Sequence, residues 1–275
     1  MTEIDARAAR RRFERAAATY LAAARLETEV GTRMLERLDY VRIAPARILD
    51  AGSGPAPQAV ALGKRYPGAQ LLAVDFSLPM LRQARAMGWL ARLRGARRPA
   101  AICASLERLP FAAGSVQLLW SNMALHWVQD PRAALAEFQR VLAPEGLLMF
   151  STLGPDTLKE LRAVAGKGRV HSFADMHDLG DWLVAAGFSA PVMDMETLTL
   201  EYRDVPALLS ELRASGQTSA RADRPRGLAG KGLLASLAPA GSRATCEVVY
   251  GHAWKGVPRK SADGRSIVQF DRLPR

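Results

Sequence analysis

The sequence has few cysteines and few histidines, which argues against a disulfide-rich protein and against a metal-binding one. Its 275 residues include two cysteines, Cys103 and Cys246, which lie far apart and outside any CxxC pattern. This spacing argues against a disulfide framework and favours a reducing compartment. The four histidines show no metal-ligand spacing, so we expect no bound metal.

Long apolar runs are also missing. No stretch approaches the roughly 20 apolar residues that a membrane helix requires. The first 20 residues mix acidic and basic side chains around no apolar centre, so we do not expect a secretory signal. We therefore expect a cytoplasmic protein with no membrane partner. Because 49% of the residues are hydrophobic, the chain can form one sizeable core.

The charge balance is strongly basic and rests on arginine. The formal net charge is +11, and 32 of the 38 basic residues are arginine. A basic balance fits an acidic partner, but a GC-rich genome gives the same composition without any partner. The arginines are spread along the chain, and no basic stripe is interleaved with aromatic residues. We therefore expect no nucleic-acid partner.

The middle of the chain alternates predicted strands and helices. Apolar runs predict strands at 47–52, 71–76, 100–105, 116–122 and 147–153. Amphipathic runs with cap residues predict helices at 58–66, 77–93 and 130–142. This alternation over about 100 residues predicts an α/β fold, a parallel sheet with helices on both faces.

Less regular segments flank this alternation. Residues 5–38 predict one or two helices, and two more are predicted at 156–164 and 175–186. Strands are predicted at 195–202 and 245–250, with a partly helical insertion at 204–240 between them. We divide the chain into a helical lead at 1–40, a domain at 41–255 and a polar, disordered tail at 256–275.

A glycine-rich turn follows the first predicted strand. It contains Asp50, Gly52, Ser53 and Gly54. The two glycines permit close approach of a ligand, and Asp50 can accept a hydrogen bond from a ligand ammonium group. The turn resembles the first motif of class I methyltransferases, D-x-G-x-G-x-G, although Ala56 replaces the third glycine. An ordinary tight turn between strand and helix is the alternative.

An acidic residue ends the next predicted strand. Asp75 lies 25 residues after Asp50 and is followed by Phe76. A carboxylate at this point can accept both hydroxyls of a ribose. A dinucleotide is the rival ligand, but Pro55 and Pro57 remove amide donors that a pyrophosphate would need. The pattern favours a nucleoside cofactor without phosphates, of which S-adenosylmethionine (SAM) is the methyltransferase example.

Two later segments extend this cofactor half. In class I methyltransferases, the loop before an LPF-type triplet usually carries an aspartate that accepts the adenine amino group. Ser105 holds that position here and is followed by Leu106. The segment SNMALHW at 121–127 follows the strand that borders the methyl-donor site, and we assign its Asn122 to the cofactor.

Longer segments resemble the malonyl-acyl-carrier-protein O-methyltransferase family of biotin synthesis. These segments are 10–39, 121–162, 171–202 and 246–255, and the resemblance spans most of residues 8–255. It implies a Rossmann-like seven-stranded class I sheet, with a helical lid at 1–40 and a small helical insertion before the last strand. It also implies SAM as cofactor and methylation of the free carboxylate of malonyl-acyl carrier protein or malonyl-CoA.

Such a reaction needs little catalytic apparatus. A malonyl carboxylate is ionised at pH 7 and is already the nucleophile, so the enzyme mainly aligns the reactants and excludes water. The substrate-side candidates are Tyr20, His126, Trp127 and His171. Packing is the alternative role of Tyr20, His126 and Trp127, and His126 is also a candidate base. An arginine clamp for the carboxylate is expected, but the sequence does not single one out.

The acyl-carrier partner is acidic, so a basic rim would steer it toward the site. We expect the insertion to form part of that docking face, through Arg213, Arg221, Arg224, Arg226 and Lys231. We expect the protein itself to be a monomer.

Two alternatives stay open. The same cofactor half can serve another small-molecule, RNA or protein acceptor. The chain also resembles mitochondrial complex I assembly factors in its LHWV and DTLKELR segments, which implies action on a protein partner. Because Ala56 and Ser105 depart from the methyltransferase pattern, a binding or scaffold protein without turnover is compatible with the sequence.

Overall fold

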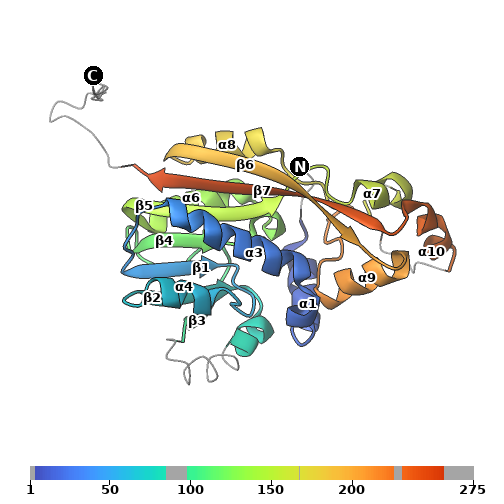
Figure 1. Cartoon of the computed structure of the whole chain (residues 1–275), viewed down its shortest axis with the longest axis horizontal. Helices are drawn as coiled ribbons and strands as arrows, with labels where there is room; N and C mark the ends of the chain where they lie inside the picture. The colour runs from blue at the N-terminus through green and yellow to red at the C-terminus, as the bar shows by residue number, and fades with distance from the viewer. Residues whose placement is uncertain (1–3, 85–97, 167, 226–230, 257–275) are drawn as a thin grey trace.

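A computed structural model describes residues 4–84, 98–166, 168–225 and 231–256, which form a seven-stranded sheet (Figure 1). The strands are β1 (Arg47–Ala51), β2 (Gln70–Asp75), β3 (Ala100–Cys103), β4 (Val116–Ser121), β5 (Leu142–Leu153), β6 (Phe188–Glu201) and β7 (Arg243–Lys255). Their order is β3-β2-β1-β4-β5-β7-β6. β1 to β5 pair in parallel, whereas β7 runs antiparallel to β5 and β6. The predicted class I methyltransferase sheet is confirmed.

Helices cover both faces of the sheet, as predicted. The helices are α1 (Ala6–Ala16), α2 (Tyr20–Ala23), α3 (Arg25–Arg37), α4 (Ala59–Arg65), α6 (Pro131–Val141), α7 (Lys159–Ala165), α8 (Met176–Ala185), α9 (Val205–Ala214) and α10 (Lys231–Leu237). On one face, α3 and α4 pack with Ile48 and Trp120; on the other, α6 and α8 pack with Leu49 and Phe150. Successive strand residues such as Ile48 and Leu49 therefore point into different halves of the core.

The helix boundaries follow local cap chemistry. Asp130 accepts hydrogen bonds from the backbone N–H groups of Arg132 and Ala133, at 2.9 and 3.2 Å, and Pro131 occupies the first helical position of α6. These contacts satisfy N–H groups that have no partner inside the helix. The start of α6 is therefore where the sequence placed it.

The last two strands are longer than the sequence predicted. β6 covers Phe188–Glu201 and β7 covers Arg243–Lys255, whereas the alternation marked only 195–202 and 245–250. β6 has a register shift between Ser189 and Val192, which breaks its alternation. Its length is set by pairing with β7, a distant partner that local periodicity does not reveal.

The helical lead and the insertion pack against each other (Figure 1). The Asp5 N–H donates to the Ala220 carbonyl at 2.8 Å, and the Arg12 guanidinium donates to the Thr218 carbonyl at 2.8 Å. An ion pair of 2.9 Å joins Arg224 to Asp5. Segments about 200 residues apart in sequence thus form one cover beside the strand ends. The predicted tail beyond residue 256 and the predicted helical stretch 85–93 lie outside the described residues.

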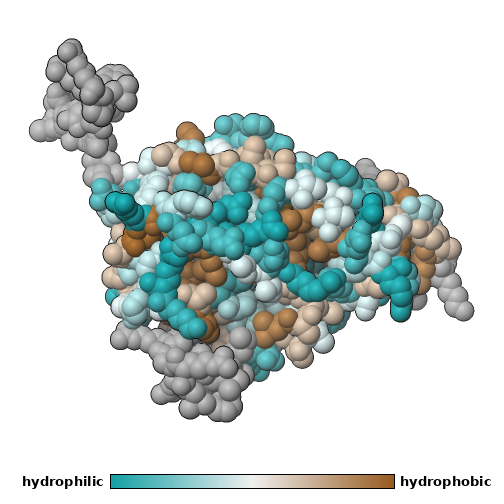
Figure 2. All heavy atoms as spheres, viewed as in Figure 1, coloured by the Kyte–Doolittle hydropathy of each residue, from teal (hydrophilic) through white to brown (hydrophobic). Residues whose placement is uncertain are grey.

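Hydrophilic residues dominate the face over α3, and hydrophobic residues show beside the end of α3 that faces α9 (Figure 2). Among the described residues, no helix is long and apolar enough to cross a bilayer.

Gly251 offers a test of the β5–β7 pairing. A Cβ at this position would lie 2.3 Å from Cε1 of Phe150 and 3.0 Å from Sδ of Met193. Gly251→Ala should therefore lower the free energy of unfolding by about 1–3 kcal/mol, measured by urea denaturation. Gly68→Ala is the control, because a Cβ there meets nothing within 4 Å. Equal losses in the two variants would contradict this packing.

Candidate functional site

A cavity of about 350 Å³ opens at the carboxyl ends of the parallel strands. Strand order reverses between β1 and β4, and ligands of open α/β sheets bind at such a point. Seven of the nine residues assigned to the cofactor lie in its wall: Gly52, Gly54, Asp75, Phe76, Ser105, Leu106 and Asn122. The other two, Asp50 and Ser53, are buried in the glycine turn and do not line the cavity.

The glycine turn keeps its shape despite the missing third glycine. Gly52 has φ +78°, and a Cβ there would lie 2.2 Å from the Cβ of Ala124. Ala56, in place of the third glycine, has φ +53°, so it adopts the left-handed conformation that glycine would take freely. That conformation costs an alanine roughly 1 kcal/mol, which the surrounding structure offsets. The departure at Ala56 therefore leaves the turn intact.

Asp75 is held in the cavity wall by backbone donors. Its Oδ2 accepts the Gly54 N–H at 2.9 Å, and its Oδ1 accepts the Ser77 N–H at 2.7 Å. Each oxygen retains a second lone pair for a ligand hydroxyl. Burial raises the pKa of this carboxyl to about 6, although both hydrogen bonds act in the opposite direction.

Asp50 is buried without enough partners. Its Oδ2 has no hydrogen-bond partner among the described residues. Burial, together with the neighbouring Asp75, raises the pKa of Asp50 to about 8. A buried acceptor left without a donor is costly, and a cationic ligand nearby would lower that cost. The acidic groups at this turn therefore fit a ligand that carries positive charge and hydroxyl groups.

The loop after β3 is fixed by a short polar chain. Ser105 Oγ donates to Glu107 Oε2 at 3.1 Å, and Glu107 Oε1 accepts the Asp130 N–H at 2.7 Å. Glu107 thus ties the loop to the start of α6 rather than acting only as a solvated charge. The arrangement holds Ser105 in the cavity wall.

Aromatic side chains of the lead and of the segment after β4 line the cavity. Tyr20 and Trp127 both line it, as does Phe13 of α1. The Phe13 ring packs edge-on against Trp127 and against Phe76, with centroid separations of 5.0 and 5.8 Å. Of the substrate-side candidates, Tyr20 and Trp127 are therefore brought to the site.

The two histidine candidates are both in contact with polar groups of the protein. Nδ1 of His126 lies 3.1 Å from Oγ1 of Thr152, and the ring lines neither this cavity nor the second one described below. His171 Nε2 accepts the Ala220 N–H at 2.9 Å. Burial lowers the pKa of His126 to about 3 and that of His171 to about 4. The geometry therefore gives no support to His126 as a base, and His171 anchors the insertion.

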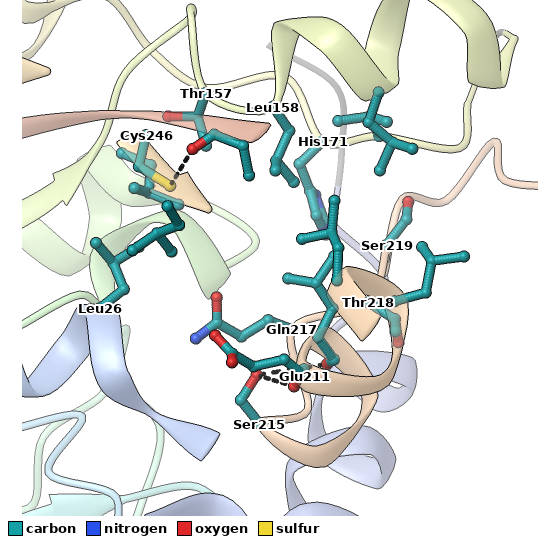
Figure 3. Close-up of a pocket in the computed structure, with 18 of the residues that line it drawn as sticks. Leu26, Thr157, Leu158, His171, Glu211, Ser215, Gln217, Thr218, Ser219 and Cys246 are labelled. Carbon is teal, nitrogen blue, oxygen red and sulfur yellow. Dashed lines mark hydrogen bonds between the residues drawn. The ribbon is translucent and has the colours of Figure 1, made fainter. Parts of the chain in front are cut away.

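A second, mostly apolar cavity of about 140 Å³ lies beside the first. Trp127 lines both cavities, so they share a wall. Leu26 and Cys246 lie on one side of the second cavity, Gln217 and Glu211 below, and His171 opposite (Figure 3). The insertion therefore supplies much of its wall.

Glu27 is a site residue that sequence reasoning missed. It lines the second cavity, its side chain is buried, and its Oε1 has no hydrogen-bond partner among the described residues. One signal was present in the sequence: Glu27 precedes Val30 and Met34 at spacings of three and seven, on the apolar stripe of α3. A glutamate on a buried stripe needs an explanation beyond packing.

The expectation that all five basic residues of the insertion face a partner is wrong. Arg221 is buried and forms ion-pair contacts with Asp223 at 2.7 and 2.8 Å. Arg224 is committed to Asp5, whereas Arg213 is exposed. Arg226 and the side chain of Lys231 lie outside the described residues.

Comparison with known proteins identifies relatives of the whole chain. The family model described as a methyltransferase domain matches residues 49–150. Malonyl-[acyl-carrier protein] O-methyltransferases of Gallionella capsiferriformans and Methylovorus sp. are 48% and 50% identical, each over 97% of this chain and at least 95% of their own. Among solved structures, the YcgJ protein of Bacillus subtilis has a TM-score of 0.61 at 18% identity, covering 84% of this chain and 99% of its own.

The buried acids predict how stability depends on pH. The pKa values of Asp75, Glu27 and Asp50 rise to about 6, 7 and 8, so the folded state holds protons that the unfolded state has released. Below about pH 6.5 the buried histidines act in the opposite direction, because the unfolded chain protonates them and the folded chain does not. Between about pH 6.5 and pH 8 the acids dominate, the unfolded chain binds fewer protons, and stability falls as pH rises. Calorimetry of the ligand-free protein should show a lower Tm at pH 8 than at pH 6.5.

Asp50→Asn should make this fall in Tm smaller, because it removes the acid whose pKa is raised most. Asp181→Asn is the control, since Asp181 is exposed on α8. A Tm that rises across this pH range, or an equal effect of both variants, would contradict the assignment.

Proposed function

The chain belongs to the malonyl-acyl-carrier-protein O-methyltransferase family, and we propose that it transfers a methyl group from SAM to the free carboxylate of a malonyl thioester. The observation that carries this proposal is the sequence similarity to these enzymes over nearly the whole chain. The similarity therefore includes the residues of the second cavity as well as the cofactor half that the family model matches. The methyl ester disguises the malonyl group for elongation toward the pimeloyl part of biotin. We place the reaction in the cytoplasm, on malonyl-acyl carrier protein or malonyl-CoA, with the enzyme as a monomer.

The residues of the first cavity fit the cofactor. SAM, when bound, supplies a methyl group that is already activated on a positively charged sulfonium. Asp75 is placed to accept the ribose hydroxyls, and Ser105 with the Leu106 backbone to meet the adenine. The unpartnered Asp50 offers negative charge to the cationic end of the molecule. Gly52 leaves room for its close approach.

We assign the second cavity to the acceptor. Its apolar walls exclude water from a carboxylate that must lose its hydration before it attacks. Arg169 lines this cavity and forms no hydrogen bond or ion pair with another described side chain, so it is our candidate for the carboxylate clamp. The lead at 1–40 and the insertion at 204–240 then act together as the lid over both cavities, and 41–255 is the methyltransferase domain.

The exposed face of α1 is the better docking surface for an acidic carrier. Arg7, Arg11 and Arg15 recur every four residues, are exposed, and form no ion pair among the described residues. Arg7 lies in the wall of the first cavity, so the stripe begins at the site. This surface takes the place of the insertion residues that the fold has already paired.

The activity is tested with purified protein and labelled SAM. Methylation of both malonyl-CoA and malonyl-acyl carrier protein is expected, with no labelling of acetyl-CoA, which lacks the carboxylate. Expression of the chain should also restore growth without biotin to a strain lacking this enzyme. Binding of SAM by calorimetry without methylation would point to another acceptor, and absence of binding would support a scaffold.

Reversing the charge of arginines on α1 distinguishes an effect on carrier docking from an effect on methyl transfer. Arg11→Glu with Arg15→Glu should raise KM for the carrier-bound substrate about tenfold while KM for malonyl-CoA changes less than twofold. The control is Arg42→Glu, an exposed arginine beyond the far end of α3, about 20 Å along that helix. Equal changes for both substrates would refute the docking surface.

A further inference from the structure

Glu27 is a buried acid that neither the hydrophobic core nor the cofactor cavity requires. Its side chain is 6% exposed, and Oε1 has no hydrogen-bond partner among the described residues. A leucine of similar size would fill the same place without the desolvation free energy that burying a carboxyl requires. The cost of burying this carboxyl suggests that it meets a group that is absent when the cavity is empty.

Glu27 lies where the two cavities meet. It lines the second cavity, whereas its contacts reach the first. The Nδ2–H of Asn122, in the wall of the first cavity, donates to the backbone carbonyl of Glu27 at 2.8 Å. Tyr20, in the same wall, is electrostatically coupled to Glu27, Asp50 and Asp75. Glu27 therefore lines the second cavity at the point where its backbone contacts the wall of the first, between the assigned donor and acceptor sites.

The surroundings of Glu27 favour its protonated form. Burial is the main cause that raises its pKa to about 7; a hydrogen bond from its own backbone N–H acts in the opposite direction, and the charge of Glu211 on α9 adds to the rise. Glu211 itself is held by Arg25 at 2.6 Å and by the Tyr202 hydroxyl at 2.8 Å. Of the other titratable groups in the described part of the chain, Tyr20 on α2 and Cys246 on β7 interact with Glu27 and are neutral at pH 7, and Arg169 and His171 line the same cavity.

We propose that the protonated carboxyl of Glu27 donates a hydrogen bond to the free carboxylate of the acceptor, and so selects the acid over its methyl ester. This role rests on the proposed function. A hydrogen bond from a neutral acid to a carboxylate is charge-assisted and strong. The neutral ester product accepts a weaker bond, which favours its release. Once ionised, Glu27 repels the acceptor carboxylate.

The pH dependence of kcat/KM for malonyl-CoA tests this role. The malonyl carboxylate is ionised throughout pH 6–9, so the alkaline limb reports a group of the free enzyme. In the wild type, kcat/KM should fall roughly tenfold for each pH unit above about 7. Glu27→Gln keeps a hydrogen-bond donor that does not titrate. This variant should remain active, and its kcat/KM should no longer fall above pH 7.

Two further variants distinguish this role from a structural one. Glu27→Leu should fold with an unchanged or higher Tm but lose roughly tenfold to 100-fold in kcat/KM at pH 7. Glu36→Gln makes the same exchange at an exposed position of α3 and should leave the limb unchanged. An alkaline limb that persists in Glu27→Gln, or a wild-type profile that is flat, would overturn the proposal.

A binding measurement separates this proposal from the proposed function. Calorimetry of malonyl-CoA, with S-adenosylhomocysteine present, should show affinity that weakens above pH 7 in the wild type but not in Glu27→Gln. If this dependence appears without methylation, the function fails and the role of Glu27 stands. If methylation proceeds and neither the rate nor the affinity depends on Glu27, only this inference fails. If malonyl-CoA neither binds nor reacts, both fail.

Discussion

The site depends on carboxyl groups buried close together at the ends of β1 and β2 with little positive charge beside them. Asp75 is held by two backbone N–H groups, whereas Asp50 keeps an oxygen without a partner. Their mutual repulsion and desolvation make the empty cavity costly, and a cationic nucleoside ligand relieves both effects. The left-handed turn at Gly52 and Ala56 follows from this constraint, because it brings the Gly54 N–H onto Asp75.

The cover of the site is built from two distant parts of the chain. The lead supplies Phe13 and Tyr20 to the first cavity, and the insertion supplies Gln217 and Glu211 to the second. The Ala220 carbonyl of the insertion links them by accepting the Asp5 N–H, and His171 holds Ala220 by accepting its N–H. The two cavities are therefore covered by one structure, in which the lead and the insertion contact each other, and this suits a reaction that needs water excluded.

Elements whose signals are local were predicted closely. The cap at Asp130 and the turn at Gly52 depend on neighbouring residues, so spacing alone located them. The strands β6 and β7 were underestimated because each is completed by a partner about 55 residues away. Arg221 seemed available for docking, but its burial beside Asp223 is a property of the folded insertion.

The sequence by itself determined the parallel sheet and the glycine-rich turn, because each arises from short-range periodicity or from residue types at fixed spacing, and its longer segments carried the resemblance that implies the class of chemistry. Only the tertiary structure decided that His126 bonds to Thr152 away from both cavities, and that His171 and the buried Glu27 line the second cavity. Burial and hydrogen-bond partners set the protonation state of such groups, and both depend on segments brought together by folding. The role of a titratable residue therefore depends on its surroundings in the folded protein and not on its residue type alone.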